Sequence, residues 1–369
     1  MGFLIPRLAS YVIDVLGLSS PGSVFLSGLL VYPIASLFWG ILSDKTLHVR
    51  NIQVLCSWLG GIAILIFAQP SFLKGDDSTA SFVWALVAIS LGGTIPLANV
   101  AFLQSGHPDK KYAGVRLFGT LGFLFANVLL LFTRLPESTL IFVAGILFIF
   151  STLFLFATTK KRKVHDDSSF EIKLVPYYFK SIEFLFFCGI LFLFFASFAP
   201  AEHVIGSELK KIEFPLNSVS LSWVLATFAE ALFYVFVAKK ESMNYQFFLG
   251  FGLLAGILRW ACMLILPIST YTIFIQTLHG LQFGPAYLGL VLWLKKRAAP
   301  HNLATAQALA MIFGRSLGTG IAAFLFANMA KAGNFFNVYL FAMLAGFIGL
   351  IALWKLTPYV PKRKYFLDF

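Results

Sequence analysis

Long apolar runs separated by short polar segments make up most of the chain. A helix needs about 20 apolar residues to cross the hydrocarbon layer of a membrane, and barrel strands are about half as long. The pattern therefore predicts an all-α integral membrane protein with twelve crossings, eleven of full length and one short. The short run is 3–18, and the full runs are 22–43, 51–69, 81–104, 114–133, 138–158, 183–205, 216–238, 246–266, 270–294, 302–329 and 334–355.

The composition supports a membrane protein. Of 369 residues, 59% are hydrophobic and 12% are charged, whereas about 25% of a soluble domain is charged. The three cysteines, Cys56, Cys188 and Cys262, all lie in apolar runs, which favours buried hydrophobic side chains over a disulfide or a metal site. The net charge of +12 comes from basic loops, so we expect a lipid bilayer as the partner and no nucleic acid.

Basic residues gather in alternate loops. If the segment after run 22–43 faces the cytoplasm, twenty of the 28 Lys and Arg residues lie on the cytoplasmic side and five lie in outer loops. The positive-inside rule then places both termini in the cytoplasm. We expect a multi-pass protein of a bacterial inner (cytoplasmic) membrane, present as a monomer.

A charged segment near the midpoint separates six runs from six. The predicted organisation is an N-terminal six-helix bundle over 1–158, a cytoplasmic central loop over 159–181, a C-terminal six-helix bundle over 182–356 and a cytoplasmic tail over 357–369. A solvated linker is favoured over a binding platform for the central loop.

The first run does not fit a full crossing. It is about 16 residues long and contains Pro6, Arg7 and Asp14. Either the first helix is truncated at the start of the chain, or it is short and Arg7 extends to the headgroups. We favour truncation.

The end of the first full run, 22–43, and the loop after it carry a recognisable pattern, "GILSDKTLHVR" at 40–50. Gly40 allows close helix approach, and Asp44 can cap a helix or pair across the cytoplasmic face. Lys45 and Arg50 can anchor that face to anionic headgroups. The stretch resembles the loop signature of the major facilitator superfamily.

A narrower resemblance, to the phenylpropionate-permease/lactose-permease-like branch, rests on five stretches. These are "RLFGTLGF" (116–123), "AE" (229–230), "RW" (259–260), "QTLHGLQFG" (276–284) and "ATAQALAM" (304–311). The resemblance implies two six-helix bundles around a central cavity that exchange access by rocking. It also implies a substrate that moves with a proton, among sugars, nucleosides and aromatic acids.

Four charged or titratable residues share the middle depth of the second half: Glu230, Arg259, His279 and Arg315. Each costs roughly 2.5–3.5 kcal/mol if it faces lipid unpaired. We expect Glu230 to be a protonatable carboxylate biased by Arg259, with His279 as a second titrating or hydrogen-bonding group. The alternative is a fixed Glu230–Arg259 ion pair that holds the helices together.

Other polar positions are candidates for the substrate. Arg315 either binds an anionic group or is a second partner of Glu230. Gln276, His279 and Phe283 lie on one helix face. Gln276 and Gln307 either contact substrate or form interhelical hydrogen bonds.

The first half offers fewer candidates. Asn99 is a polar substrate candidate in run 81–104. Arg116, at the predicted inner end of run 114–133, either forms a gate pair with Asp44 or anchors to headgroups.

No motif for phosphate binding, metalloprotease chemistry or a nucleophilic serine occurs, so we expect no enzyme activity, metal or cofactor. The adjacent Glu202 and His203 lack a third metal ligand. The predicted function is secondary active transport by alternating access, as a proton symporter for a small-molecule substrate such as an aromatic or other carboxylate. The alternatives are a sugar or nucleoside proton symporter, and a non-transporting receptor or scaffold on the same fold.

Overall fold

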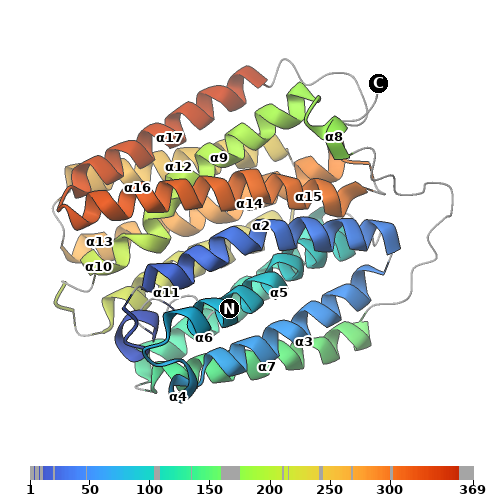
Figure 1. Cartoon of the computed structure of the whole chain (residues 1–369). Helices are drawn as coiled ribbons and strands as arrows, with labels where there is room; N and C mark the ends of the chain where they lie inside the picture. Colours follow the sequence, from blue (N-terminus) through green and yellow to red (C-terminus); the bar gives the residue numbers. More distant parts are fainter. Residues whose placement is uncertain are drawn as a thin grey trace. The chain divides into compact units, whose positions relative to one another are not determined.

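A computed structural model shows an arrangement of helices (Figure 1). Every regular element within the residues that it describes is helical. The described residues are 4, 8, 11–19, 21–46, 48–103, 109–133, 135–158, 175–209, 212–214, 216–240, 244–266, 269–299 and 302–356.

The chain forms two compact units, and the first comprises 1–106, 132–172 and 300–309. In this unit α5 packs against both α2 and α3, and α3 packs against α7 (Figure 1). The helices are the short η1 (Tyr11–Val15), α2 (Pro21–Thr46), α3 (Val49–Phe67), the short α4 (Pro70–Leu73), α5 (Asp77–Leu103) and α7 (Glu137–Thr158). Most of α15 (Leu303–Met311) also belongs to unit 1.

The second unit comprises 107–131, 173–299 and 310–369. In this unit α14 packs against α11 and α12, and α9 packs against η4, α16 and α17. The helices are α6 (Asp109–Phe132), α8 (Val175–Tyr178), α9 (Ile182–His203), α10 (Ile205–Leu209), α11 (Ser218–Val237), α12 (Tyr245–Ile265), α13 (Thr270–Ile275), α14 (Thr277–Arg297), the π-helical η4 (Ile312–Thr319), α16 (Gly320–Lys331) and α17 (Phe335–Leu356).

Each of the eleven full runs contains a helix. Two runs are interrupted: run 270–294 is divided at Gln276 into α13 and α14, and run 302–329 contains α15, η4 and α16. Within the described residues, nine helices are long and apolar enough to cross a membrane by length and composition. The polar residues of α14 keep it out of this set, and α7 contributes a shorter apolar segment, Glu137–Leu153.

Several predicted segments lie outside the described residues. They include Pro6 and Arg7 of the short first run, most of the central loop and the tail 357–369. The packing units also assign α6 to unit 2 and 300–309 to unit 1. The six-plus-six division therefore stays a prediction.

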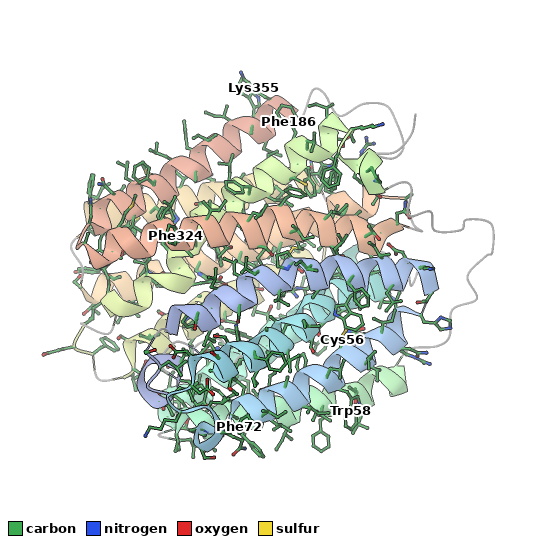
Figure 2. All side chains as sticks on the ribbon, in the orientation of Figure 1. Cys56, Trp58, Phe72, Phe186, Phe324 and Lys355 are labelled. Carbon is green, nitrogen blue, oxygen red and sulfur yellow. The ribbon has the colours of Figure 1, made fainter. Side chains whose placement is uncertain are left out.

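Side chains on one helix divide between the interior and the membrane-facing surface. Figure 2 shows Trp58 projecting from α3. This side chain is 46% exposed, whereas Cys56 on the same helix is fully buried. Cys188 is also buried, as predicted, and Cys262 is half-buried. Exposed aromatic side chains such as Trp58 and Phe324 are suited to contact with lipid.

Two glycines bring α14 and α11 of unit 2 into close contact. A Cβ atom at Gly280 of α14 would lie 1.9 Å from the carbonyl oxygen of Ala226 on α11. One turn later, a Cβ at Gly284 would lie 3.0 Å from Cγ of Glu230. Two small residues four apart let membrane helices approach closely. The sequence "GLQFG" therefore holds α14 directly against the helix that carries Glu230.

Candidate functional site

Glu230 lies within a polar group that we call the Glu230 cluster: Arg116, Thr120, Glu230, Tyr234 and Tyr287. Arg116 and Thr120 are four residues apart on α6, so they share one face of that helix. The Thr120 hydroxyl donates a hydrogen bond to Glu230 Oε1 over 3.0 Å. The Arg116 guanidinium lies 4.7 Å from the centre of the Tyr287 ring, bonds the Tyr234 hydroxyl and interacts electrostatically with Glu230.

Arg259 lies in a second group, the Arg259 cluster, with Gln276, His279 and Gln282. Its guanidinium nitrogen Nη1 is 3.2 Å from Nδ1 of His279 and donates to Oε1 of Gln282 over 3.3 Å. Nη2 donates to Oε1 of Gln276. The break between α13 and α14 falls at Gln276, so this interruption directs an amide side chain toward the arginine.

The predicted partnership of Glu230 with Arg259 is therefore wrong in detail. Among the described residues, Arg259 contacts neutral acceptors, and the guanidinium beside Glu230 belongs to Arg116. Arg116 is half-buried, and its guanidinium packs on the ring of Tyr287. Arg116 and Thr120 are four residues apart in "RLFGT". This spacing is the sequence signal for a guanidinium and a hydroxyl on one helix face.

Aromatic rings link the two clusters along α14. The His279 ring packs 4.6 Å from Phe198 and 4.9 Å from Trp223, measured between centroids. Phe283 contacts Phe198 and stacks on Tyr287 at 5.3 Å. The predicted common face of Gln276, His279 and Phe283 thus continues to Tyr287, which belongs to the Glu230 cluster.

Arg315 pairs with an acid other than Glu230, the partner that its depth in the membrane suggested. It forms a salt bridge with Glu202 at 3.0 Å and lies 5.8 Å from the centre of the Phe195 ring. Arg315 lies on η4 and Glu202 on α9, which pack together. The alternative in which Arg315 is a second partner of Glu230 is therefore not supported, and the charge of Arg315 is balanced.

The loop residues form a helix cap within unit 1. The Asp44 carboxylate accepts hydrogen bonds from the backbone N–H of Ala304 at 3.3 Å and of Thr305 at 2.7 Å. The Thr305 hydroxyl also donates to it at 2.7 Å. The first N–H groups of a helix have no partner within the helix, so Asp44 of α2 satisfies the start of α15.

Gly40, one turn before Asp44, explains how α2 reaches α15. A Cβ atom there would lie 3.0 Å from the carbonyl oxygen of Ala304 and 3.1 Å from Cβ of Ala308. Beyond the cap, Lys45 is exposed and Arg50 is half-buried. The expected close approach at Gly40 and the capping role of Asp44 both agree with this geometry.

Replacing Asp44 with alanine is expected to destabilise the protein by about 1.5–3 kcal/mol, because hydrogen bonds to a buried charged group contribute that much. Asp44→Asn, which keeps one acceptor oxygen, should lie between alanine and the native protein. Thermal unfolding of the purified proteins measures both changes. The matched control Lys74→Gln, at an exposed position, should not change the melting temperature. Equal melting temperatures for Asp44→Ala and the native protein would contradict the cap.

Two further candidates lie in unit 1. Asn99 on α5 and Gln307 on α15 are both buried. Neither amide atom of Gln307 has a hydrogen-bond partner, so this side chain remains a candidate for substrate contact. Within the described part of the chain, no group of three or more His, Cys, Asp or Glu residues could hold a metal ion.

Comparisons with known proteins identify the family. The sequence profile of the MFS_1 like family matches residues 2–341. The chain belongs to this family. A transporter of the major facilitator superfamily is thus the established class, and the family members that it resembles are transporters and not enzymes. The narrower phenylpropionate-permease/lactose-permease-like branch stays a prediction.

Individual relatives agree with this membership. The MFS_1 like chain is 26% identical over 385 residues to the uncharacterized transporter YwbF of Bacillus subtilis, covering 98% of this chain and 90% of the relative. The nucleoside transporter NupG has a similar fold at 16% identity, with a TM-score of 0.72 and coverage of 96% and 95%. The proton:xylose symporter XylE is 13% identical, with a TM-score of 0.72 and coverage of 98% and 92%. These two structures show the major facilitator fold alone.

Proposed function

We propose that this transporter is a proton symporter for a small organic solute, an aromatic or other carboxylate, and that it works by alternating access. The observation that carries the proposal is the Glu230 cluster. Glu230 lies within the membrane-spanning α11. A carboxylate at this depth costs free energy, so its presence there indicates a functional role or a partner. Its hydrogen-bond partner there is a hydroxyl, with a guanidinium nearby.

These neighbours suit both protonation states of Glu230. A threonine hydroxyl can donate to a carboxylate or accept from a carboxylic acid, so the Thr120 contact survives loading and unloading of a proton. Arg116 can remain bonded to Tyr234 and stacked on Tyr287 in both states. The cluster therefore supports reversible protonation better than the fixed Glu230–Arg259 pair.

The substrate class is supported by the surroundings of the Arg259 cluster. Trp223 and Phe283 are half-buried rings, and both pack with neighbouring aromatic side chains. Rings of this kind stack on an aromatic solute, and Arg259 provides positive charge. The second candidate is a sugar or nucleoside, because Glu202 balances Arg315 and the amides of Gln276 and Gln282 suit neutral hydroxyl-bearing solutes.

The setting in the membrane is part of the proposal. We place the protein as a monomer in a bacterial inner membrane with both termini in the cytoplasm, on the distribution of basic residues. A receptor or scaffold without transport is a weaker candidate, because the named relatives are transporters.

Uptake into proteoliposomes tests the function. An aromatic carboxylate, a nucleoside and a hexose are each supplied as labelled solutes, with and without an inward proton gradient. We expect one class to accumulate inside only with the gradient, and a protonophore to abolish the accumulation. Equal uptake with and without the gradient would overturn proton symport.

A further inference from the structure

Four arginines lie within the described helices of unit 2, and they differ in what balances their charge. Arg297 forms a salt bridge with Glu183. Arg315 forms a salt bridge with Glu202. Arg116 lies near Glu230 and interacts with it electrostatically. The contacts of the Arg259 side chain are His279, Gln276, Gln282 and the Trp260 ring. None of these is an acid, so among the described residues no carboxylate contacts the buried guanidinium of Arg259.

The Arg259 cluster has more hydrogen-bond donors than acceptors. Nε of Arg259 and Nε2 of Gln282 are both buried and have no hydrogen-bond partner. Both atoms can only donate. Arg259 is 1% exposed and Gln282 is fully buried, so bulk water does not satisfy them. The missing component is an acceptor, and the charge of Arg259 favours one that is anionic.

The side chains around Arg259 hold it in place. Its guanidinium carbon lies 4.4 Å from the centre of the Trp260 ring, and Trp260 Nε1 donates to the carbonyl oxygen of Ser197. The Trp260 ring also stacks on Tyr339, whose hydroxyl bonds Glu208. The acid nearest along this chain of contacts, Glu208, is engaged with Tyr339, which itself interacts electrostatically with Arg259.

A carboxylate fits these requirements. It has two oxygens that accept and cannot donate, and it matches the planar donors of a guanidinium. The His279 ring lies between Phe198 and Trp223 on the same cluster. An aromatic acid could thus place its ring against these side chains with its carboxylate directed toward Arg259.

We propose that the Arg259 cluster is the subsite that binds the carboxylate of the transported solute, and that it is separate from the proton site at Glu230. This inference rests on the proposed function for its substrate. It reassigns Arg259 and His279 from proton coupling to substrate binding. It also gives the symport a charge balance: the solute adds one negative charge at Arg259, and the proton adds one positive charge at Glu230.

Two variants test the subsite in different ways. Arg259→Gln removes the positive charge. Gln282→Glu keeps Arg259 and places a carboxylate beside it, so the protein supplies its own competitor for the site. Both variants lower the net charge of the cluster by one, but at different side chains, so a fold defect in one does not prevent the test with the other. Lys240→Gln, at an exposed position, removes one positive charge outside the cluster as the matched control.

The measurement is binding to the purified full chain in detergent, without a proton gradient. Phenylacetate is compared with its uncharged amide, phenylacetamide, and with chloride. We expect the native protein and Lys240→Gln to bind the acid at least about tenfold more tightly than the amide, a large and easily resolved difference. Both cluster variants should lose that preference and bind the acid and the amide with similar affinity. Melting temperatures check that the variants are folded.

Several results would overturn the inference. One is equal affinity of the native protein for acid and amide, and another is a folded Gln282→Glu or Arg259→Gln protein that keeps the preference. Binding of chloride without binding of phenylacetate would assign the site to an inorganic anion and would also overturn it. If a nucleoside or hexose accumulates under the proton gradient while phenylacetate does not bind, proton symport stands and the carboxylate subsite fails.

Discussion

Replacing Glu230 with glutamine is expected to abolish proton-driven accumulation of the substrate while leaving its downhill movement intact. Glutamine has the shape of glutamate and can still accept from Thr120, so the packing of α6, α11 and α14 should be kept. It cannot exchange a proton. Without coupling between the two sites, the ratio of inside to outside substrate should fall to about one.

The measurement is uptake by proteoliposomes under an inward proton gradient, together with exchange of labelled for unlabelled substrate at equal pH. Exchange needs no net proton movement, so Glu230→Gln should perform it at a rate near that of the native protein. Glu137→Gln, at the start of α7 in unit 1, is the matched control and should accumulate substrate normally. Full accumulation by Glu230→Gln would remove the basis for assigning the proton to this residue.

Replacing Gly280 with valine is expected to prevent α14 from packing on α11. The added Cβ alone would lie 1.9 Å from the carbonyl oxygen of Ala226 and 2.7 Å from the backbone nitrogen of Glu230. Both are backbone atoms, which cannot move aside as a flexible side chain can. Overpacking usually costs about 1–3 kcal/mol, and a clash between two backbones should exceed that range.

The yield of monodisperse protein and its melting temperature measure the effect of Gly280→Val. Gly189→Ala on α9 is the control, because no atom lies within 4 Å of the added Cβ. In a helix interior, alanine is favoured over glycine by about 1 kcal/mol, so the control should be at least as stable as the native protein. A Gly280→Val protein with native yield and melting temperature would show that the two helices can separate at little cost.

The helices themselves could be predicted from the sequence because their apolar runs match the length of a membrane crossing. Depth along each run also identified Glu230, Arg259 and His279 as residues of interest. Depth does not specify rotation about the helix axis or which helices are neighbours. That missing information accounts for the wrong pairing of Glu230 with Arg259, since both were placed at similar depth.

The depth of Arg116 differs from the expected depth for another reason. The apolar run begins at 114, but α6 begins at Asp109. Arg116 therefore lies seven residues into the helix, about 10 Å along its axis at 1.5 Å per residue. The polar first turns of α6 hid this start, because "DKKYAG" interrupts the hydrophobic pattern without ending the helix. Its partner Thr120 carries no charge, so composition gave no reason to select it.

The contact between Asp44 and α15 has a consequence for biosynthesis. The two partners are separated by 260 residues of chain, so the carboxylate leaves the ribosome long before the helix that it caps. Contacts so distant in sequence form late and slow the folding of a polypeptide. Until translation has passed Thr305, the nascent chain must therefore tolerate Asp44 without its final partner.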